Sequence, residues 1–237
     1  MTRAKGDFLH WVLTCEHAAK RVPREYAALG LSRAALAGHI GWDIGARDVQ
    51  RVLARELEAT AVWSRVSRLL VDANRTPYEE SLIPVQSDGV VVPGNAHVSA
   101  ADRKRRIRLY HEPYHARVNQ ILERAIGAAP GNVRLLSLHS FTPQMDGRVR
   151  NFDIGVLFDA HVPLARAFGR ALVREKFSIR YNEPYSGYDG LIYAPKRHGE
   201  AHDVPYVELE INNRLIRTPA AAGRVGRRIA RALRTLG

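Results

Sequence analysis

Cysteine is almost absent from this chain of 237 residues: Cys15 is the only one, so no intramolecular disulfide can form. Long apolar runs are also absent, because no stretch approaches the roughly 20 apolar residues that span a bilayer. Residues 1–7 lack the apolar segment of a signal peptide, and the sequence contains no internal repeat. These absences exclude a disulfide-stapled scaffold and a membrane protein. They predict one domain, residues 1–237, in the cytoplasm, large enough to bury its own core.

Acidic residues are scarce relative to basic ones, with 24 against 36, and none follows Glu210. The arginines of the C-terminal segment are interleaved with apolar residues at helical spacing: Ala222, Val225, Ile229, Leu233 and Leu236. This pattern predicts an amphipathic helix whose arginines lie on its solvated faces. No aromatic interleaving or groove-reading motif accompanies the charge, so nucleic acid is not expected as a partner.

Strand-like and helix-like segments alternate along the sequence, which is typical of a mainly parallel sheet covered by helices. The fold class we predict is therefore α/β, a single domain with a mostly parallel or mixed twisted sheet flanked by helices. The expected strands lie at residues 8–15, 61–63, 69–71, 133–138, 155–158 and 204–211, and two of the expected helices at residues 44–59 and 163–176.

Two further segments have sequence patterns that predict their structure. Ser99 and Asp102 have the spacing of a capping box, which predicts the start of a long helix that Pro113 should kink or divide. Residues 77–95 have a loop-like composition rich in proline and glycine. Loops of about 15 residues or more in a compact domain tend to be functional or disordered, so this segment is predicted to form a wall or lid over a site.

Ionisable side chains follow three of the apolar strands. Glu16 and His17 come after the first, His139 after the strand at 133–138, and Glu210 at the end of the last. The carboxyl ends of parallel strands meet at one edge of an open α/β sheet, where ligands bind. Histidines and carboxylates brought together there are the ligands of a mononuclear zinc hydrolase. The candidate Zn²⁺ ligands are Glu16, His17 and His139, with a fourth position left for water.

The third ligand has an alternative. Adjacent residues of a strand point to opposite faces, so Glu16 and His17 converge only if the chain has already turned into a loop. Asp43 is the substitute, either as a ligand or as a carboxylate that holds a ligand histidine, although an aspartate ahead of a helix can simply cap it. Cys15 could instead be a thiol nucleophile, but a cysteine at the end of an apolar strand is more often a small buried hydrophobe.

Two pairs of residues could act on a substrate. Glu208 and Glu210 are two apart on one strand and share a face. If that strand end reaches a metal, Glu210 can take a proton from water and pass it to a leaving amine, which makes it the catalytic candidate. Asn74 and Arg75 place an amide beside a guanidinium whose planar fork suits a carboxylate, so they are candidates for binding a small anionic substrate.

The segments that carry these residues resemble the N-formylglutamate amidohydrolase family, in order and over nearly the whole chain. They are residues 14–18 (TCEHA), 21–23 (RVP), 39–46 (HIGWDIGA), 67–75 (SRLLVDANR), 93–95 (PGN), 113–115 (PYH), 138–143 (LHSFTP), 182–186 (NEPYS) and 208–211 (ELEI). The resemblance implies a zinc-dependent hydrolase that cleaves the amide of an N-acyl amino acid. Its first candidate substrate is N-formyl-L-glutamate, split into formate and L-glutamate as in histidine degradation.

The family in turn resembles the zinc carboxypeptidases distantly. In that likeness His17 and His139 are similar to zinc ligands. Asn74 and Arg75 are similar to the pair that binds a substrate carboxylate, and Glu210 is similar to the catalytic glutamate. The likeness implies a carboxypeptidase-like arrangement of sheet and helices.

Three departures from the family pattern fall near the expected pocket. Lys20 stands where the family usually has asparagine and the carboxypeptidases have a glutamate ligand, and Asn212 stands where arginine is usual. Residues 148–155 replace a more usual Arg-Pro-Trp-His-Ile-Gly pattern. These departures leave two alternatives open: a hydrolase of a different N-acyl amino acid, or a basic binding protein that keeps the fold without the activity.

Overall fold

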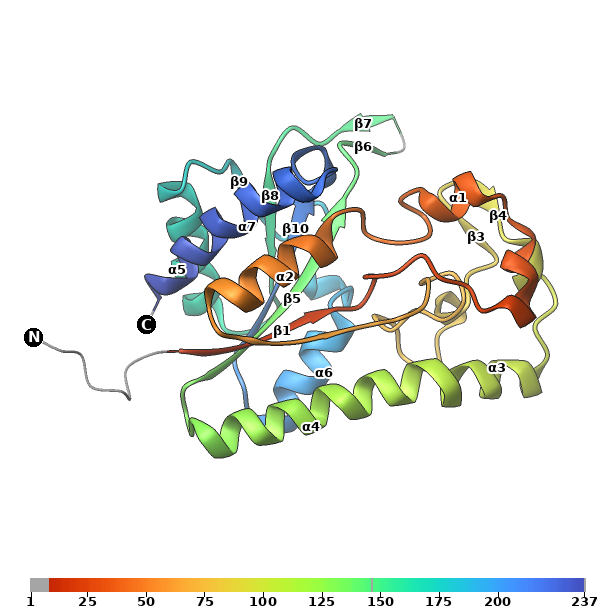
Figure 1. Cartoon of the computed structure of the whole chain (residues 1–237), viewed down its shortest axis with the longest axis horizontal. Helices are drawn as coiled ribbons and strands as arrows, with labels where there is room; N and C mark the ends of the chain where they lie inside the picture. Colours follow the sequence, from red (N-terminus) through yellow and green to blue (C-terminus); the bar gives the residue numbers. More distant parts are fainter. Residues whose placement is uncertain (1–8, 146, 237) are drawn as a thin grey trace, which may run out of the picture.

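A six-stranded sheet forms the centre of the molecule (Figure 1), for which the computed structural model describes residues 9–145 and 147–236. The strands follow one another across the sheet in the order β2 (Thr60–Trp63), β1 (His10–Cys15), β5 (Val133–Phe141), β10 (Tyr206–Asn212), β8 (Ile154–Leu157) and β9 (Ile179–Tyr181). The first four are parallel, β8 is antiparallel to β10, and β9 is parallel to β8. The predicted α/β class with a mixed, mostly parallel sheet is therefore confirmed. Residue 8, the expected start of the first strand, lies outside the described residues.

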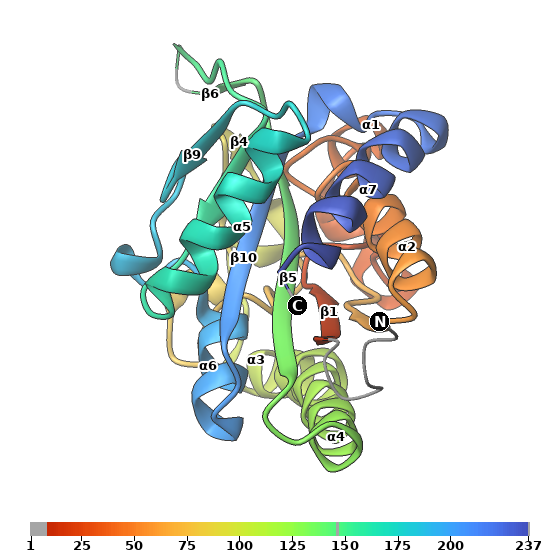
Figure 2. The ribbon, with the colours of Figure 1, turned by 90° about the vertical axis from the view of Figure 1, so that its left-hand side faces the viewer.

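Helices cover both faces of the sheet (Figures 1 and 2). One layer consists of α2 (Ala46–Glu56), α5 (Val162–Arg174) and α7 (Pro219–Arg234), and the other of α4 (Glu112–Ala128) and α6 (Tyr193–His202). Along β10, Val207 and Leu209 are buried against the first layer, whereas Tyr206 belongs to the core beneath α4 and α6. Because side chains alternate between faces along a strand, Glu208 and Glu210 also fall on the α4 and α6 side.

The long helix predicted from the capping box is present. Ser99 accepts a hydrogen bond from the backbone N–H of Asp102 at 3.1 Å, and α3 (Ala100–Arg106) begins there. A π-helical turn, Ile107–His111, joins α3 to α4, so the three segments form one rod along the base of the molecule in Figure 1. Pro113 therefore does not divide the helix, because the wider turn ahead of it accommodates the missing N–H group.

Short elements gather beyond the carboxyl ends of the parallel strands, at the right and the top of Figure 1. They are α1 (Arg33–Ala37), the hairpin of β3 (Gln86–Ser87) with β4 (Val90–Val91), and the hairpin of β6 (Gln144–Met145) with β7 (Arg148–Val149). Short 3-10 turns lie at Arg24–Gly30, Glu80–Leu82, Pro93–Asn95, Gly187–Asp189 and Asn213–Leu215. Among the described residues, no helix combines the length and the apolar character needed to cross a bilayer.

One expected strand is wrong. Residues 69–71 form a turn, not a strand, and lie in a separate small core together with Leu29 and Leu82. Polar side chains satisfy the carbonyl groups that a neighbouring strand would otherwise have bonded: Asn95 donates to the carbonyl of Leu69 at 2.8 Å, and Arg106 to that of Leu70 at 3.3 Å. A short buried apolar run is compatible with either structure, and here tertiary partners decided between them. The strand β9 and the helix α6 were not predicted.

Candidate active site

The alternation of side chains along three parallel strands brings five polar residues to one face of the sheet. Glu208 of β10 lies beside Ser137 of β5, and Glu210 lies beside His139. Glu16 directly follows β1, the neighbour of β5 on its other side. All five are at most 5 % exposed: Glu16, Ser137, His139, Glu208 and Glu210. The strand-end residues singled out in the sequence therefore do meet at the carboxyl end of the parallel strands.

His139 lies between carboxylates on both sides of its ring. Its Nε2 is 2.9 Å from Glu16 Oε2, and its Nδ1 is 2.8 Å from Asp43 Oδ2. Burial opposes a charge here, but the carboxylates of Glu208, Asp43 and Glu16 raise the pKa of His139 well above its usual value. The electrostatic field of these carboxylates thus favours a positive charge at the position of His139.

A carboxylate also binds the ring of His17, but one ring nitrogen of His17 has no hydrogen-bond partner in the described part of the chain. Its Nε2 donates to Asp72 Oδ1 at 2.7 Å, whereas its buried Nδ1 has no hydrogen-bond partner among the described residues and lies 3.5 Å from Asp43 Oδ2. One donor atom each from His17, Asp43 and His139 lies within 4.8 Å of the other two. In both histidines a carboxylate fixes Nε2, which leaves Nδ1 directed at Asp43.

Asp43 owes its position to the turn ahead of α2. The helix begins at Ala46 behind Gly45, which has a φ of 81°, and no side chain caps it. A Cβ at position 45 would lie 2.1 Å from the carbonyl oxygen of Ile216, so glycine is required there. Asp43 accepts a hydrogen bond from the backbone N–H of Ser140 at 3.1 Å. The carboxylate is therefore not a helix cap and is available to the two histidines.

Glu16 has a different environment from Asp43. Its Oε1 accepts a hydrogen bond from the hydroxyl of Tyr114 at 2.6 Å, and its Oε2 accepts one from Ser137 at 2.7 Å in addition to facing His139. Burial opposes ionisation, but the hydrogen bonds from His139, Tyr114 and Ser137 lower the pKa of Glu16 to about 2. The structure thus brings Asp43, the alternative third ligand, to the donor atoms of His17 and His139, and places Glu16 where it orients His139.

Glu208 and Glu210 form a second group of possible ligands with His139. Burial raises the pKa of Glu208 to about 7. Burial also raises the pKa of Glu210 well above its usual value; the charge of His139 opposes this shift, and those of Asp43 and Glu208 add to it. The Oε2 atom of Glu210 is buried and has no hydrogen-bond partner among the described residues. This side chain is therefore suited to hold and release a proton.

A cleft of about 270 Å³ opens over these groups, and Asn74 and Arg75 line it. The side chain of Asn74 is already bonded within the protein. Its Oδ1 accepts a hydrogen bond from the N–H of Ala194 at the start of α6, and its Nδ2 lies 3.4 Å from Glu208 Oε2. Arg75 donates to the carbonyl of Asn74 and is 3.8 Å from the carboxylate of Glu79, an exposed side chain. Arg68, in contrast, already lies between Asp72 at 3.2 Å and Asp43 at 3.7 Å. Arg75 is thus the cleft's arginine best placed to take a substrate carboxylate.

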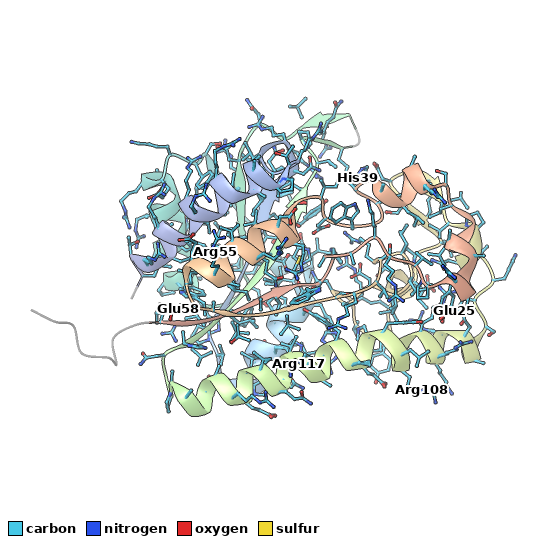
Figure 3. The ribbon with its side chains drawn as sticks, in the orientation of Figure 1. Glu25, His39, Arg55, Glu58, Arg108 and Arg117 are labelled. Atoms are coloured by element: carbon cyan, nitrogen blue, oxygen red, sulfur yellow. The ribbon has the colours of Figure 1, made fainter. Side chains whose placement is uncertain are left out.

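The predicted wall over the site is formed in part by the β3–β4 hairpin. Ser87 and Asp88 of this hairpin line the cleft, and Asp88 Oδ2 lies 2.8 Å from Nε2 of His39, beside α1 (Figure 3). The segments that contain His39 and Asp88 are far apart in the sequence, and this hydrogen bond joins them at the cleft.

The chain matches a known protein family. The family model for N-formylglutamate amidohydrolase matches residues 9–217. The chain belongs to the N-formylglutamate amidohydrolase family. No curated protein sequence matches it.

Several solved structures are similar to this chain. A gene product of Agrobacterium tumefaciens is 35% identical with a TM-score of 0.89, over 98% of this chain and 92% of its own. The N-formylglutamate amidohydrolase of Ralstonia eutropha JMP134 shares the fold at 19% identity and a TM-score of 0.69, over 98% and 94%. A metallo-carboxypeptidase from Pseudomonas aeruginosa aligns at 13% identity and a TM-score of 0.41, over 98% and 58%.

The departures from the family pattern fall outside the cleft. Lys20 is exposed, with its Nζ 5.4 Å from the ring centre of Trp42. Asn212 is buried and donates to the carbonyls of Arg150 and Phe152, so it fixes the neighbouring loop. Cys15 is fully buried, does not line the cleft, and has a pKa raised by burial, which argues against a thiol nucleophile.

Sequence reasoning identified Asp43 as a residue that could hold a site histidine, but not Asp72, which holds His17, nor Ser137 and Tyr114, which hold Glu16. Asp72 lies in the same family segment as Asn74 and Arg75, and Ser137 shares a strand face with His139, so period-2 alternation could have indicated Ser137. Tyr114 comes from α4 and reaches Glu16 across 98 residues of sequence. No local pattern indicates a partner at that separation.

Proposed function

We propose that this member of the family is a metal-dependent amidohydrolase of N-acyl amino acids, with N-formyl-L-glutamate as its first candidate substrate and formate and L-glutamate as products. The observation that carries the proposal is the convergence of donor atoms from His17, Asp43 and His139, with a carboxylate fixing Nε2 of each histidine. Carboxylate–histidine pairs of this kind orient metal ligands. The proposal places the reaction in the cytoplasm, at the last step of histidine degradation.

The side chains fit a zinc ion. Two imidazole nitrogens and one carboxylate oxygen match a three-ligand catalytic zinc site with one open position. The buried, unpartnered Nδ1 of His17 is costly to leave without a partner, and a cation would satisfy it. The chemistry that zinc supplies in such a ligand set is Lewis acidity, which polarises an amide carbonyl and acidifies water.

The protein's own groups would perform the proton transfers and bind the substrate. Glu210 would accept the proton of the attacking water at its unpartnered Oε2 and return it to the leaving nitrogen. Arg75 would bind the substrate carboxylate, held in place by its bond to the carbonyl of Asn74. The His39–Asp88 contact would limit the access of bulk water.

The test combines metal analysis with a substrate panel. The purified chain should contain close to one zinc per molecule, lose activity with a chelator and regain it with zinc. N-formyl, N-acetyl and N-succinyl amino acids would identify the acyl group. Glu210→Gln should keep its metal but lose activity by about 10²- to 10⁴-fold, whereas Glu123→Gln, an exposed control on α4, should be unaffected. A chain that binds no metal and hydrolyses nothing after zinc is added would support the basic binding protein instead.

A further inference from the structure

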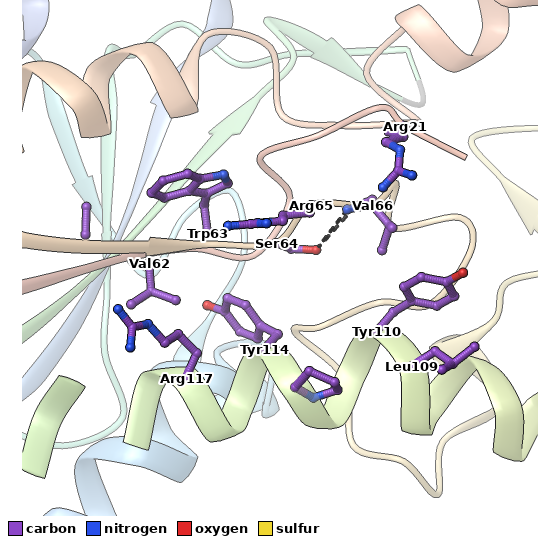
Figure 4. Close-up of a pocket in the computed structure, with 12 residues that line it drawn as sticks. Arg21, Val62, Trp63, Ser64, Arg65, Val66, Leu109, Tyr110, Tyr114 and Arg117 are labelled. Atoms are coloured by element: carbon purple, nitrogen blue, oxygen red, sulfur yellow. Dashed lines mark hydrogen bonds between the residues drawn. The ribbon is translucent and has the colours of Figure 1, made fainter. Parts of the chain in front are cut away.

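A second, larger cleft lies outside the candidate active site. Its volume is about 480 Å³, and it lies between the long helical rod and the segment that continues β2 (Figure 4). The two clefts have no lining residue in common. Tyr114 lines this cleft, and its hydroxyl donates to Glu16 of the candidate active site. The volume falls within the range of about 300 to 1,000 Å³ that small-molecule sites occupy.

The cleft has an unbalanced positive charge. Arg21, Arg65 and Arg117 line it from three separate segments, and none of its twelve lining residues is acidic. Among residues 9–145 and 147–236, none of these three arginines forms an ion pair; Arg117 makes only a long hydrogen bond to Gln120. Glu25, which is not among the lining residues, accepts a hydrogen bond from Tyr110.

Arginines elsewhere in the described chain are frequently paired, as in Arg214 with Asp153 and Arg231 with Glu175. The cleft differs from them in that three exposed arginines line it and no carboxylate does. Like charges that line a hollow raise the local potential and attract an anion. Guanidinium forks match phosphate and carboxylate oxygens two at a time.

The remaining walls are aromatic and apolar. In Figure 4, Arg21 extends into the gap from above, and Tyr110 and Tyr114 extend into it from the helix below. Trp63 borders the upper side, and Leu109, which is 43% exposed, lies at the rim. Rings beside arginines suit a ligand that combines a flat apolar body with anionic groups.

We propose that this basic cleft binds a small organic polyanion with a flat ring, the chemistry of a nucleoside phosphate. The arginines take the anionic groups, and the tyrosines and Leu109 contact the ring. This site lies outside the proposed catalytic cleft; Tyr114, which donates to Glu16, is the one lining residue that also contacts the candidate active site.

The test is a calorimetric titration of the full chain with ATP, AMP, adenosine and inorganic tripolyphosphate, with tryptophan fluorescence as a second readout. ATP should bind, and AMP should bind more weakly than ATP. Adenosine lacks the anionic groups and tripolyphosphate lacks the ring, so each should bind at least about tenfold more weakly than ATP. Trp63→Phe should remove the fluorescence change and retain binding, because Trp63 is the tryptophan that lines the cleft.

Two variants, each lacking one arginine charge, would show whether ATP binds in this cleft. Arg65→Gln and Arg117→Gln should each weaken ATP binding about tenfold, the effect of losing one charge-assisted contact. The matched controls are Arg108→Gln and Arg224→Gln, exposed arginines outside the cleft, of which Arg108 extends away from the rod in Figure 3. Equal binding by cleft variants and controls would overturn the proposal, and so would equal affinity for ATP and tripolyphosphate, or no ATP binding at millimolar concentration.

Discussion

The two carboxylates hydrogen-bonded to the ring of His139 have different further partners. Glu16 has a donor on each oxygen, from Tyr114 and Ser137, and faces the Nε2 side of the ring. Asp43 faces the Nδ1 side, together with the free nitrogen of His17. At the scale of single residues, Asp43 is therefore the better candidate for a ligand, and Glu16 for the group that orients one.

Isosteric amides at these two positions should affect metal affinity unequally. Asp43→Asn removes a candidate ligand, whereas Glu16→Gln weakens a supporting hydrogen bond, a change that typically costs about 10- to 100-fold in affinity. Competition with a chromogenic zinc chelator should show the larger loss for Asp43→Asn. A larger loss for Glu16→Gln would instead make Glu16 the third ligand.

At the scale of elements, a chain of buried histidines ties α4 and α6 to the segment that holds Arg75. His111 Nε2 is 3.0 Å from the carbonyl of Arg75 and 3.2 Å from His115 Nε2, and His115 Nδ1 is 2.8 Å from His198 Nε2. His198 Nδ1 then reaches Asn119 Oδ1 at 2.8 Å. With Asn119 Oδ1 as an acceptor, neutral tautomers make His198 Nε2 and His115 Nε2 acceptors as well, and the single N–H of His111 Nε2 faces both His115 Nε2 and the Arg75 carbonyl. Burial lowers the pKa of all three histidines, which favours that neutral state.

Breaking this chain at His111 should affect substrate binding more than turnover. His111→Phe removes the N–H group facing the Arg75 carbonyl, at a cost of roughly 1 to 2 kcal/mol, so KM should rise about tenfold while kcat changes little. His111→Gln, whose amide N–H can occupy a similar place, should restore much of the affinity. Steady-state kinetics on the substrate found in the panel would check this. Equal effects of both variants on kcat alone would contradict a positioning role.

At the scale of the whole molecule, the same histidines make stability depend on pH. Burial lowers the pKa of His198 from 6.5 to about 4, so the unfolded chain binds a proton there at a higher pH than the folded chain does. The contribution of His198 is present above pH 6.5 and is lost as the pH falls towards about 4.

Urea unfolding at a series of pH values would measure this effect. His198→Asn keeps a donor near the position of Nδ1 but does not titrate, so its free energy of unfolding should fall less between pH 6.5 and pH 4 than that of the natural chain. Parallel curves for the two proteins would contradict the assignment of the slope to His198.

The net charge of +12 has a structural explanation over part of the molecule. On α7, the apolar positions predicted from the sequence are buried or partly buried, and Arg231 and Arg234 reach Glu175 and Glu56. The expectation of a solvated basic helix face is thus confirmed there. The expectation that nucleic acid is not a partner stays a prediction.

The sequence by itself determined the α/β class, the position of five of the six strands of the main sheet and of most helices, and the arrival of His139 and Glu210 at strand ends. These features depend on local periodicity and on the rule that parallel strands end at one edge. Only the tertiary structure decided that residues 69–71 form a turn, that Asp43 faces both histidines, and that Tyr114 holds Glu16. Each of those outcomes depends on hydrogen-bond partners distant in sequence, and periodicity specifies the face of an element but not the side chain it meets.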